Sequence, residues 1–163
     1  MIDVDADAFP MNVVLALKAA FSTVDPAVPV LMRPIRVGDP VQAWAITASM
    51  WTPDDQSWEM LGASSITGAT VNRYIIGIQS FNQDMDSERG LQVSATMAGI
   101  VRSKLSRDPV VRASLAALQS TELGYTEKVQ RFYVQGQRFL SNEIDRTFYH
   151  LSNLEFLIET EIQ

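Results

Sequence analysis

The closing segment, residues 151–163, constrains the fold more than any other part of the sequence. Its apolar side chains recur with a period of two residues, at Leu154, Phe156, Ile158 and Ile162. Polar and acidic side chains take the alternate positions, at Asn153, Glu155, Glu159, Glu161 and Gln163. This alternation is typical of a strand with one face in the core and the other facing water or a partner. The segment therefore predicts a half-buried strand whose carboxylates face outward.

Length and composition predict one domain spanning residues 1–163, long enough to enclose its own core. The chain has no cysteine, which excludes disulfides and thiolate metal sites. It has no apolar run near the ~20 residues that cross a bilayer. The first residues, Met1 to Asp7, are acidic where a signal peptide is basic. We therefore expect neither a membrane partner nor export by a signal peptide.

The net charge of −6 argues against a nucleic-acid-binding protein, because neutralising phosphates requires clustered lysines and arginines. The charge is also unevenly distributed. Residues 101–120 have four basic side chains and one acidic, a net of +3, whereas residues 121–163 have four basic and seven acidic, a net of −3. This polarity is compatible with an ordinary solvated surface, and it also suits head-to-tail packing of identical subunits.

The order of elements is predicted to be helix, strands, helix, strands. The first helix runs from Phe9 to about Thr23, with Asp7 as its cap and Val14, Leu17 and Phe21 as its apolar stripe. The second begins after Asp84 or Asp86 and ends at Asp108-Pro109. Its expected stripe, which should cover the closing strand, is Leu91, Ala95, Ala98, Val101 and Leu105.

Alternating apolar residues predict strands at 41–51, 73–81, 128–138 and the closing segment, with short strands at 28–32 and 57–61. Residues 110–118 fit either a helix or a strand. Residues 62–68 and 141–146 are predicted to be loops. The fold class is therefore α+β, with a small mixed, largely antiparallel sheet and two main helices packed on one face.

No catalytic, cofactor or metal site is predicted. Asp3, Asp5 and Asp7 have the spacing that opens a calcium loop, but the required glycine and closing glutamate are missing. His150 is the only histidine, and no serine lies in a Gly-x-Ser-x-Gly elbow. We therefore expect a packed histidine rather than an enzyme. Of the tryptophans, Trp44 and Trp51 flank one strand with opposite parity, so we expect one in the core and one at the sheet edge.

The order of parts resembles the tail terminator proteins of long-tailed (siphovirus-type) bacteriophages. The resemblance covers nearly the whole chain and is one of layout. It comprises the helix around Phe9-Pro10-Met11, a proline-rich segment, the strand–turn–strand at 51–62, the strand at 71–78, and the helix that opens with Asp86-Ser87-Glu88-Arg89 and is followed by two C-terminal strands.

The resemblance implies a structural virion protein of the tail and neck, assembled in the host cytoplasm. It would form a homo-oligomeric ring, a hexamer in this family, that caps the tail-tube protein and presents a surface to the head–tail connector or stopper protein. DNA would pass through such a ring without specific binding. The family has no catalytic residues to transfer, which agrees with the absence of a cofactor motif.

The candidate interface residues, chosen from the charge pattern, the tryptophans and the loops, are Arg102, Arg107, Arg112, Glu155, Glu159, Glu161, Trp51, Asn142 and Glu143. We also expect at least two of three irregular segments, 25–40, 62–68 and 141–146, to touch a neighbour. The alternatives are a connector or stopper ring protein, a small α+β isomerase or dehydratase with His150 and Asp145 in a pocket, and a cytosolic binding module.

Overall fold

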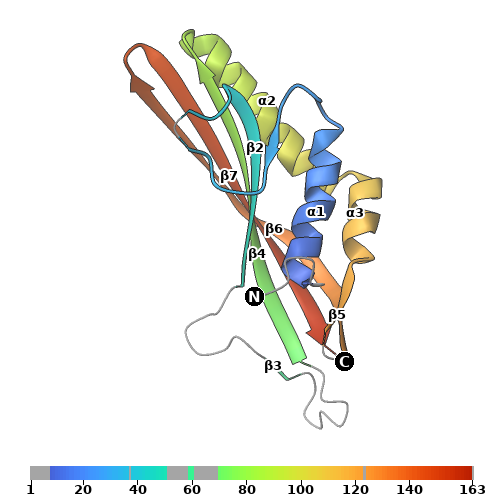
Figure 1. Ribbon diagram of the computed structural model, residues 1–163. Helices are drawn as coiled ribbons and strands as arrows, with labels where there is room; N and C mark the ends of the chain where they lie inside the picture. Colours follow the sequence, from blue (N-terminus) through green and yellow to red (C-terminus); the bar gives the residue numbers. More distant parts are fainter. Residues whose placement is uncertain (1–7, 37, 51–58, 61–69, 123, 163) are drawn as a thin grey trace.

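The computed structural model describes residues 8–36, 38–50, 59–60, 70–122 and 124–162. Three helices lie on one side of a twisted sheet (Figure 1). The helices are α1 (Phe9–Ser22), α2 (Ser87–Ser106) and α3 (Pro109–Ala116). The strands are β1 (Val30–Leu31), β2 (Gln42–Met50), β3 (Glu59–Met60), β4 (Thr70–Asp84), β5 (Gln119–Glu122), β6 (Tyr125–Ile144) and β7 (Thr147–Ile162).

The sheet has the strand order β1-β2-β4-β7-β6-β5, with β3 paired to the start of β4. Every pairing is antiparallel except the short parallel one between β1 and β2. The predicted α+β class, with a mixed and largely antiparallel sheet, is confirmed. The undecided segment after Asp108 is the third helix, α3. None of the described helices combines the length and apolarity needed to cross a membrane.

The closing strand, β7, lies in the middle of the sheet between β4 and β6, and its predicted register is confirmed. Leu154, Phe156 and Ile158 are fully buried beneath the helices. The ring of Phe156 lies 5.5 Å from that of Phe132 on β6, centroid to centroid. Because β7 pairs on both edges along most of its length, its even-numbered side chains form the central row of the core.

Helix α1 packs on β2 through the stripe that its sequence predicts. Phe21 lies 5.4 Å from Trp44, and Phe9 lies 5.3 Å from Tyr74 of β4, in each case ring centroid to ring centroid. The N-cap residue is Ala8, which provides no side-chain cap, so the proline in the first turn fixes the start of the helix. The expected cap Asp7 lies outside the described residues.

Helix α2 begins at Asp86, whose carboxylate accepts hydrogen bonds from the backbone N–H groups of Glu88 and Arg89. The predicted stripe is correct in its second half, because Ala98, Val101 and Leu105 are buried, but wrong in its first half. Leu91 and Ala95 are exposed, and the smaller residues Gly90 and Ser94 face the sheet instead. Small side chains allow this end of the helix to approach β4 and β7 closely.

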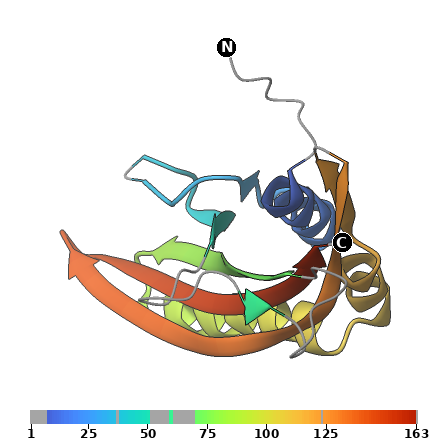
Figure 2. The same cartoon turned by 90° about the horizontal axis from the view of Figure 1, so that it is seen from below.

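The β6–β7 hairpin is longer than predicted. Residues 141–144, expected to be a loop, continue the strand, and only Asp145 and Arg146 form the turn. Both have positive φ angles, 52° and 63°, as a tight two-residue hairpin turn requires. The hairpin extends past the helices at the upper left of Figure 1. Figure 2 shows that β6 curves strongly along its length.

Most of the outer edge of β6 is unpaired among the described strands. Strand β5 pairs only with residues 125–128 of β6, so the outer edge of the remaining strand has no partner among the described strands. The β6–β7 register shifts twice, between Val129 and Arg131 and between Val134 and Gly136. Such bulges bend a strand and increase its local twist.

Candidate interaction site

The nine sequence-predicted interface residues fall in separate regions of the molecule. Arg102 and Arg107 are exposed on and just after α2, and Arg112 is exposed on α3. Arg112 is partly held within the subunit, since its guanidinium donates to the carbonyl of Leu105 at 3.1 Å and lies 4.8 Å above the ring of Phe132. Trp51 lies outside the described residues.

Glu159 lies on the outward face of β7, as predicted, but the expectation that its carboxylate faces water or a partner is wrong. Its side chain is buried, and it accepts hydrogen bonds from Arg73 Nε at 3.0 Å and from Arg131 Nε. The hydrogen bond from Arg131 foremost, together with that from Arg73, holds the pKa of Glu159 below its usual value, against the effect of burial, which raises it. Glu159 is therefore a buried anion that is paired with arginines of the two neighbouring strands, β4 and β6, and it is not part of the free surface.

The other two acids on this face of β7 are half-buried. Glu161 accepts a hydrogen bond from Gln130 Nε2 on β6. Glu155 lies in register with two glycines, Gly77 on β4 and Gly136 on β6, of which Gly136 has open space beside it. The acidic row is therefore built largely into the sheet, and it does not form the free acidic surface that the sequence predicts.

Asn142 and Glu143 are exposed near the tip of the hairpin, on β6. The backbone N–H of Glu143 donates to Asn142 Oδ1 at 2.9 Å. Among the described residues, no hydrogen bond or ion pair holds the carboxylates of Glu143 and Asp145. The hairpin tip therefore presents two unpaired acids, with Arg146 as the basic residue in the same turn.

Apolar side chains gather on the side of this hairpin that faces away from the helices. The register places Leu140, Leu151 and Phe81 side by side across β6, β7 and β4. Tyr149 lies in the next row, with its ring 6.3 Å from that of Phe81. Leu140 and Ile144 are 64% and 53% exposed. We call this set, Phe81, Leu140, Ile144, Tyr149 and Leu151, the distal patch.

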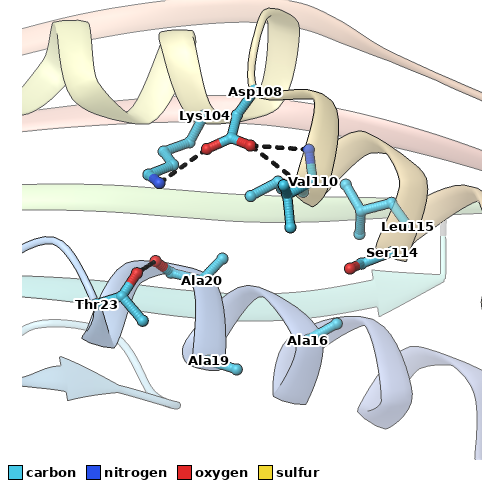
Figure 3. Close-up of a pocket in the computed structure, with 10 residues that line it drawn as sticks. Ala16, Ala19, Ala20, Thr23, Lys104, Asp108, Val110, Ser114 and Leu115 are labelled. Atoms are coloured by element: carbon cyan, nitrogen blue, oxygen red, sulfur yellow. Dashed lines mark hydrogen bonds and ion pairs between the residues drawn. The ribbon is translucent and has the colours of Figure 1, made fainter.

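A hollow of about 440 Å³ lies between α1 and α3 (Figure 3). Its α1 wall consists mainly of small side chains, Ala16, Ala19 and Ala20. The α3 wall contains Val110, which is 73% exposed, and Ser114. We call this hollow the helix groove. Ala16 and Ala19 lie on the side of α1 away from the predicted stripe, whereas Ala20 lies at the edge of the core. The sequence shows these small residues but does not indicate that they line a groove.

Lys104 and Asp108 close one end of the helix groove. Lys104 Nζ lies 2.8 Å from Asp108 Oδ2, and Asp108 also caps α3 by accepting from the N–H groups of Val110 and Val111 at 3.0 and 3.2 Å. These bonds, that from Lys104 foremost, lower the pKa of Asp108. The pair therefore stays charged and keeps the α2–α3 corner in place.

A second hollow, of about 750 Å³, adjoins the helix groove and shares Lys104 and Asp108 with it. Its other walls include Gly99, Ile100 and Arg107. No ion pair within the described residues holds the guanidinium of Arg107. The outer surface of the helices therefore has two adjoining apolar hollows, with the guanidinium of Arg107 at the rim of the second.

His150 is buried at the far end of the core from this groove. Its Nδ1 lies 2.8 Å from Ser141 Oγ, and its Nε2 has no hydrogen-bond partner within the described residues. Gly90 of α2 covers the Nε2 side of the ring. The imidazole is thus packed between helix and sheet. Within the part of the chain that the structure describes, no three acidic or histidine side chains converge as a metal site would require.

The sequence matches no family model and no curated protein. Two solved structures are similar over nearly their whole length. One, of unstated function, is 12% identical with a TM-score of 0.44, and covers 96% of this chain and 97% of its own. The other belongs to the virion of a native gene transfer agent particle. It is 11% identical with a TM-score of 0.45, and covers 94% of this chain and 95% of its own.

Proposed function

We propose that this chain is a structural protein of a phage-like virion, a tail-terminator-like subunit that assembles into a ring. The ring, a hexamer in this proposal, would cap the tail tube, end its growth and join it to the head connector. The role is mechanical and requires no cofactor. The layout resemblance described above suggested this role, and the surface of the folded chain supports it.

The observation that carries the proposal is the distal patch. Leu140 and Ile144 lie on the face of the hairpin opposite the helices, where they remain largely exposed among the described residues. Large exposed apolar clusters on a folded subunit mark a binding surface rather than a solvated one. A hairpin with an exposed apolar face suits a protein that binds other subunits.

A closed ring also needs two different surfaces on each subunit, because a cyclic contact joins one patch to another patch on the neighbour. The distal patch and the helix groove meet this requirement. They lie at opposite ends of the molecule in both views, the hairpin on the left and α1 with α3 on the right (Figures 1 and 2). The net charge of −6 suits a channel through which DNA passes without binding.

The ring is tested by measuring the mass of the purified chain by light scattering over a wide concentration range, followed by negative-stain imaging. We expect closed rings of six subunits. A chain that stays monomeric both in solution and in assembled particles would contradict the proposal.

The terminator role is tested separately, in particles assembled without this chain. If the ring ends tube growth, tails lacking it should vary in length and remain unjoined to heads. Tails of normal length that fail only to join heads would point instead to the connector or stopper role.

A further inference from the structure

We propose that the tip of the β6–β7 hairpin of one subunit inserts into the helix groove of a second copy of this chain. This inference rests on the proposed ring and specifies the contact that closes it. The part that enters the groove is the face of the hairpin tip that points away from the helices, and Leu140 and Ile144 are the inserted side chains. We call the hairpin tip the arm.

The shapes of the two surfaces support this pairing. Leu140, Asn142 and Ile144 share one side of β6, so the two apolar side chains lie on the same face, Leu140 where β4 still borders the hairpin and Ile144 in the last rung, beyond the end of β4. Ala16 and Ala19 in the α1 wall of the helix groove have small side chains, which leave room for an inserted side chain. A volume of about 440 Å³ accommodates several aliphatic side chains and is within the range of natural binding pockets.

The charges of the hairpin tip and of the groove rim are complementary. At the hairpin tip Glu143 and Asp145 are unpaired within the described residues, and Arg107 is the available cation at the rim of the adjoining hollow. Such complementarity favours one orientation of the arm and disfavours others.

The geometry makes the contact heterologous. The arm and the groove lie at opposite ends of one subunit, so the arm cannot reach its own groove. Each copy therefore offers an arm to one neighbour and a groove to the other, and repetition of this contact generates a ring when the rotation closes. The arm of each subunit ends in a rigid two-residue turn, which fixes the position of Ile144 relative to the sheet.

The absence of cysteine makes this contact directly testable by disulfide cross-linking. Two single variants, Ile144→Cys in the arm and Ala19→Cys in the groove, are purified separately, mixed, allowed to assemble and oxidised. We expect a covalent dimer in the mixture that neither variant forms alone. The matched control pairs Ala19→Cys with Leu91→Cys. Leu91 is 58% exposed on α2, on the face of the sheet opposite Ile144, so this pair should give no dimer.

The outcomes separate this inference from the proposed function. Rings that assemble without the mixed cross-link would overturn the inference and leave the ring intact. A dimer formed by Ile144→Cys alone would also overturn it, because it would mean that two arms pack against each other. An assembly-blocking variant provides the second readout: Ala19→Phe, which fills the groove from an exposed helical position, should abolish the ring while leaving the circular dichroism and melting of the subunit unchanged.

Discussion

Gly90 of α2 lies against His150 of β7 so closely that a Cβ on the glycine would be 3.0 Å from the imidazole Nε2 and 3.0 Å from Asp84 Cβ. The absence of a side chain at this position sets the distance between α2 and the sheet. It also explains why the buried face of α2 begins at a glycine and not at the neighbouring Leu91. With a larger residue at position 90, α2 could not pack this close to the sheet.

The first prediction concerns this contact. Replacing a glycine inside a helix by alanine ordinarily stabilises by about 1 kcal/mol, because alanine has the better helix propensity. We expect Gly90→Ala to lose that gain to the clash with His150, and to destabilise the fold. Gly99→Ala is the matched control in the same helix, since a Cβ there meets nothing within 4 Å. It should show the ordinary gain in urea denaturation.

A double variant tests whether contact with His150 causes the destabilisation expected for Gly90→Ala. In a His150→Ala background, Gly90→Ala should destabilise less than it does in the natural chain. Equal losses in the two backgrounds would assign the clash to Asp84 instead. The same His150→Ala variant is expected to keep its ring-forming ability, because the imidazole acts only in packing.

The second prediction concerns the core under α2 and α3. Phe156→Ala should destabilise by about 3–5 kcal/mol, because it empties a fully buried aromatic site next to Phe132. Phe139→Ala is the matched control, since Phe139 is 59% exposed. It should change the free energy of unfolding by no more than about 0.5 kcal/mol. Similar losses for the two variants in chemical denaturation would show that β6 and β7 pair in another register.

The third prediction concerns the pH dependence that Glu159 causes. Its pKa in the folded chain is lowered by Arg131 and Arg73, so the folded state favours the ionised form more than the unfolded chain does. The resulting stabilisation is present above the ordinary pKa of 4.5 and is lost as the pH falls through the lower folded value. Glu159→Gln should therefore be less stable than the natural chain at pH 7.

The two chains should converge in stability as the pH is lowered below about 4.5, which melting curves at a series of pH values will show. Comparing the variant with the natural chain at each pH removes the contribution of the other carboxyls, such as Asp84. A difference between the two chains that stays constant from pH 7 to pH 3 would contradict the assigned role.

The fourth prediction concerns Arg107 and Arg112. Charge reversal at these two positions should weaken ring assembly, and the effect should be larger at low salt, where exposed charges are less screened. Arg107→Glu is the cleaner single change, because Arg112 also bonds to the Leu105 carbonyl. Adding Glu143→Arg should partly restore assembly, as measured by sedimentation at several salt concentrations.

Local patterns predicted much of this fold. The alternation in residues 151–163 identified β7 and its buried face, and the stripe at Val14, Leu17 and Phe21 identified the buried side of α1. The extent of the hairpin was missed, because Asp145 and Arg146 adopt positive φ without the glycine or asparagine that usually marks such a turn. The preceding Ser141, Asn142 and Glu143 are polar, as loop residues commonly are.

The candidate site was harder to predict than the fold. Glu159 follows the outward half of the alternation, yet its two arginine partners lie 86 and 28 residues away, on other strands. Only the sheet order brings these three side chains together. The helix groove likewise depends on how α1 and α3 pack, which no spacing within either helix encodes.

The bulged outer edge of β6 has a consequence for how this chain behaves when it is concentrated. A long unpaired strand edge is a template for further strands, and sheets that join in this way grow without limit. The two register shifts interrupt the even row of N–H and C=O groups that such growth needs. Along the bulged part of this edge, strand addition is thereby disfavoured, and association through side chains, which a fixed number of neighbours can satisfy, is favoured.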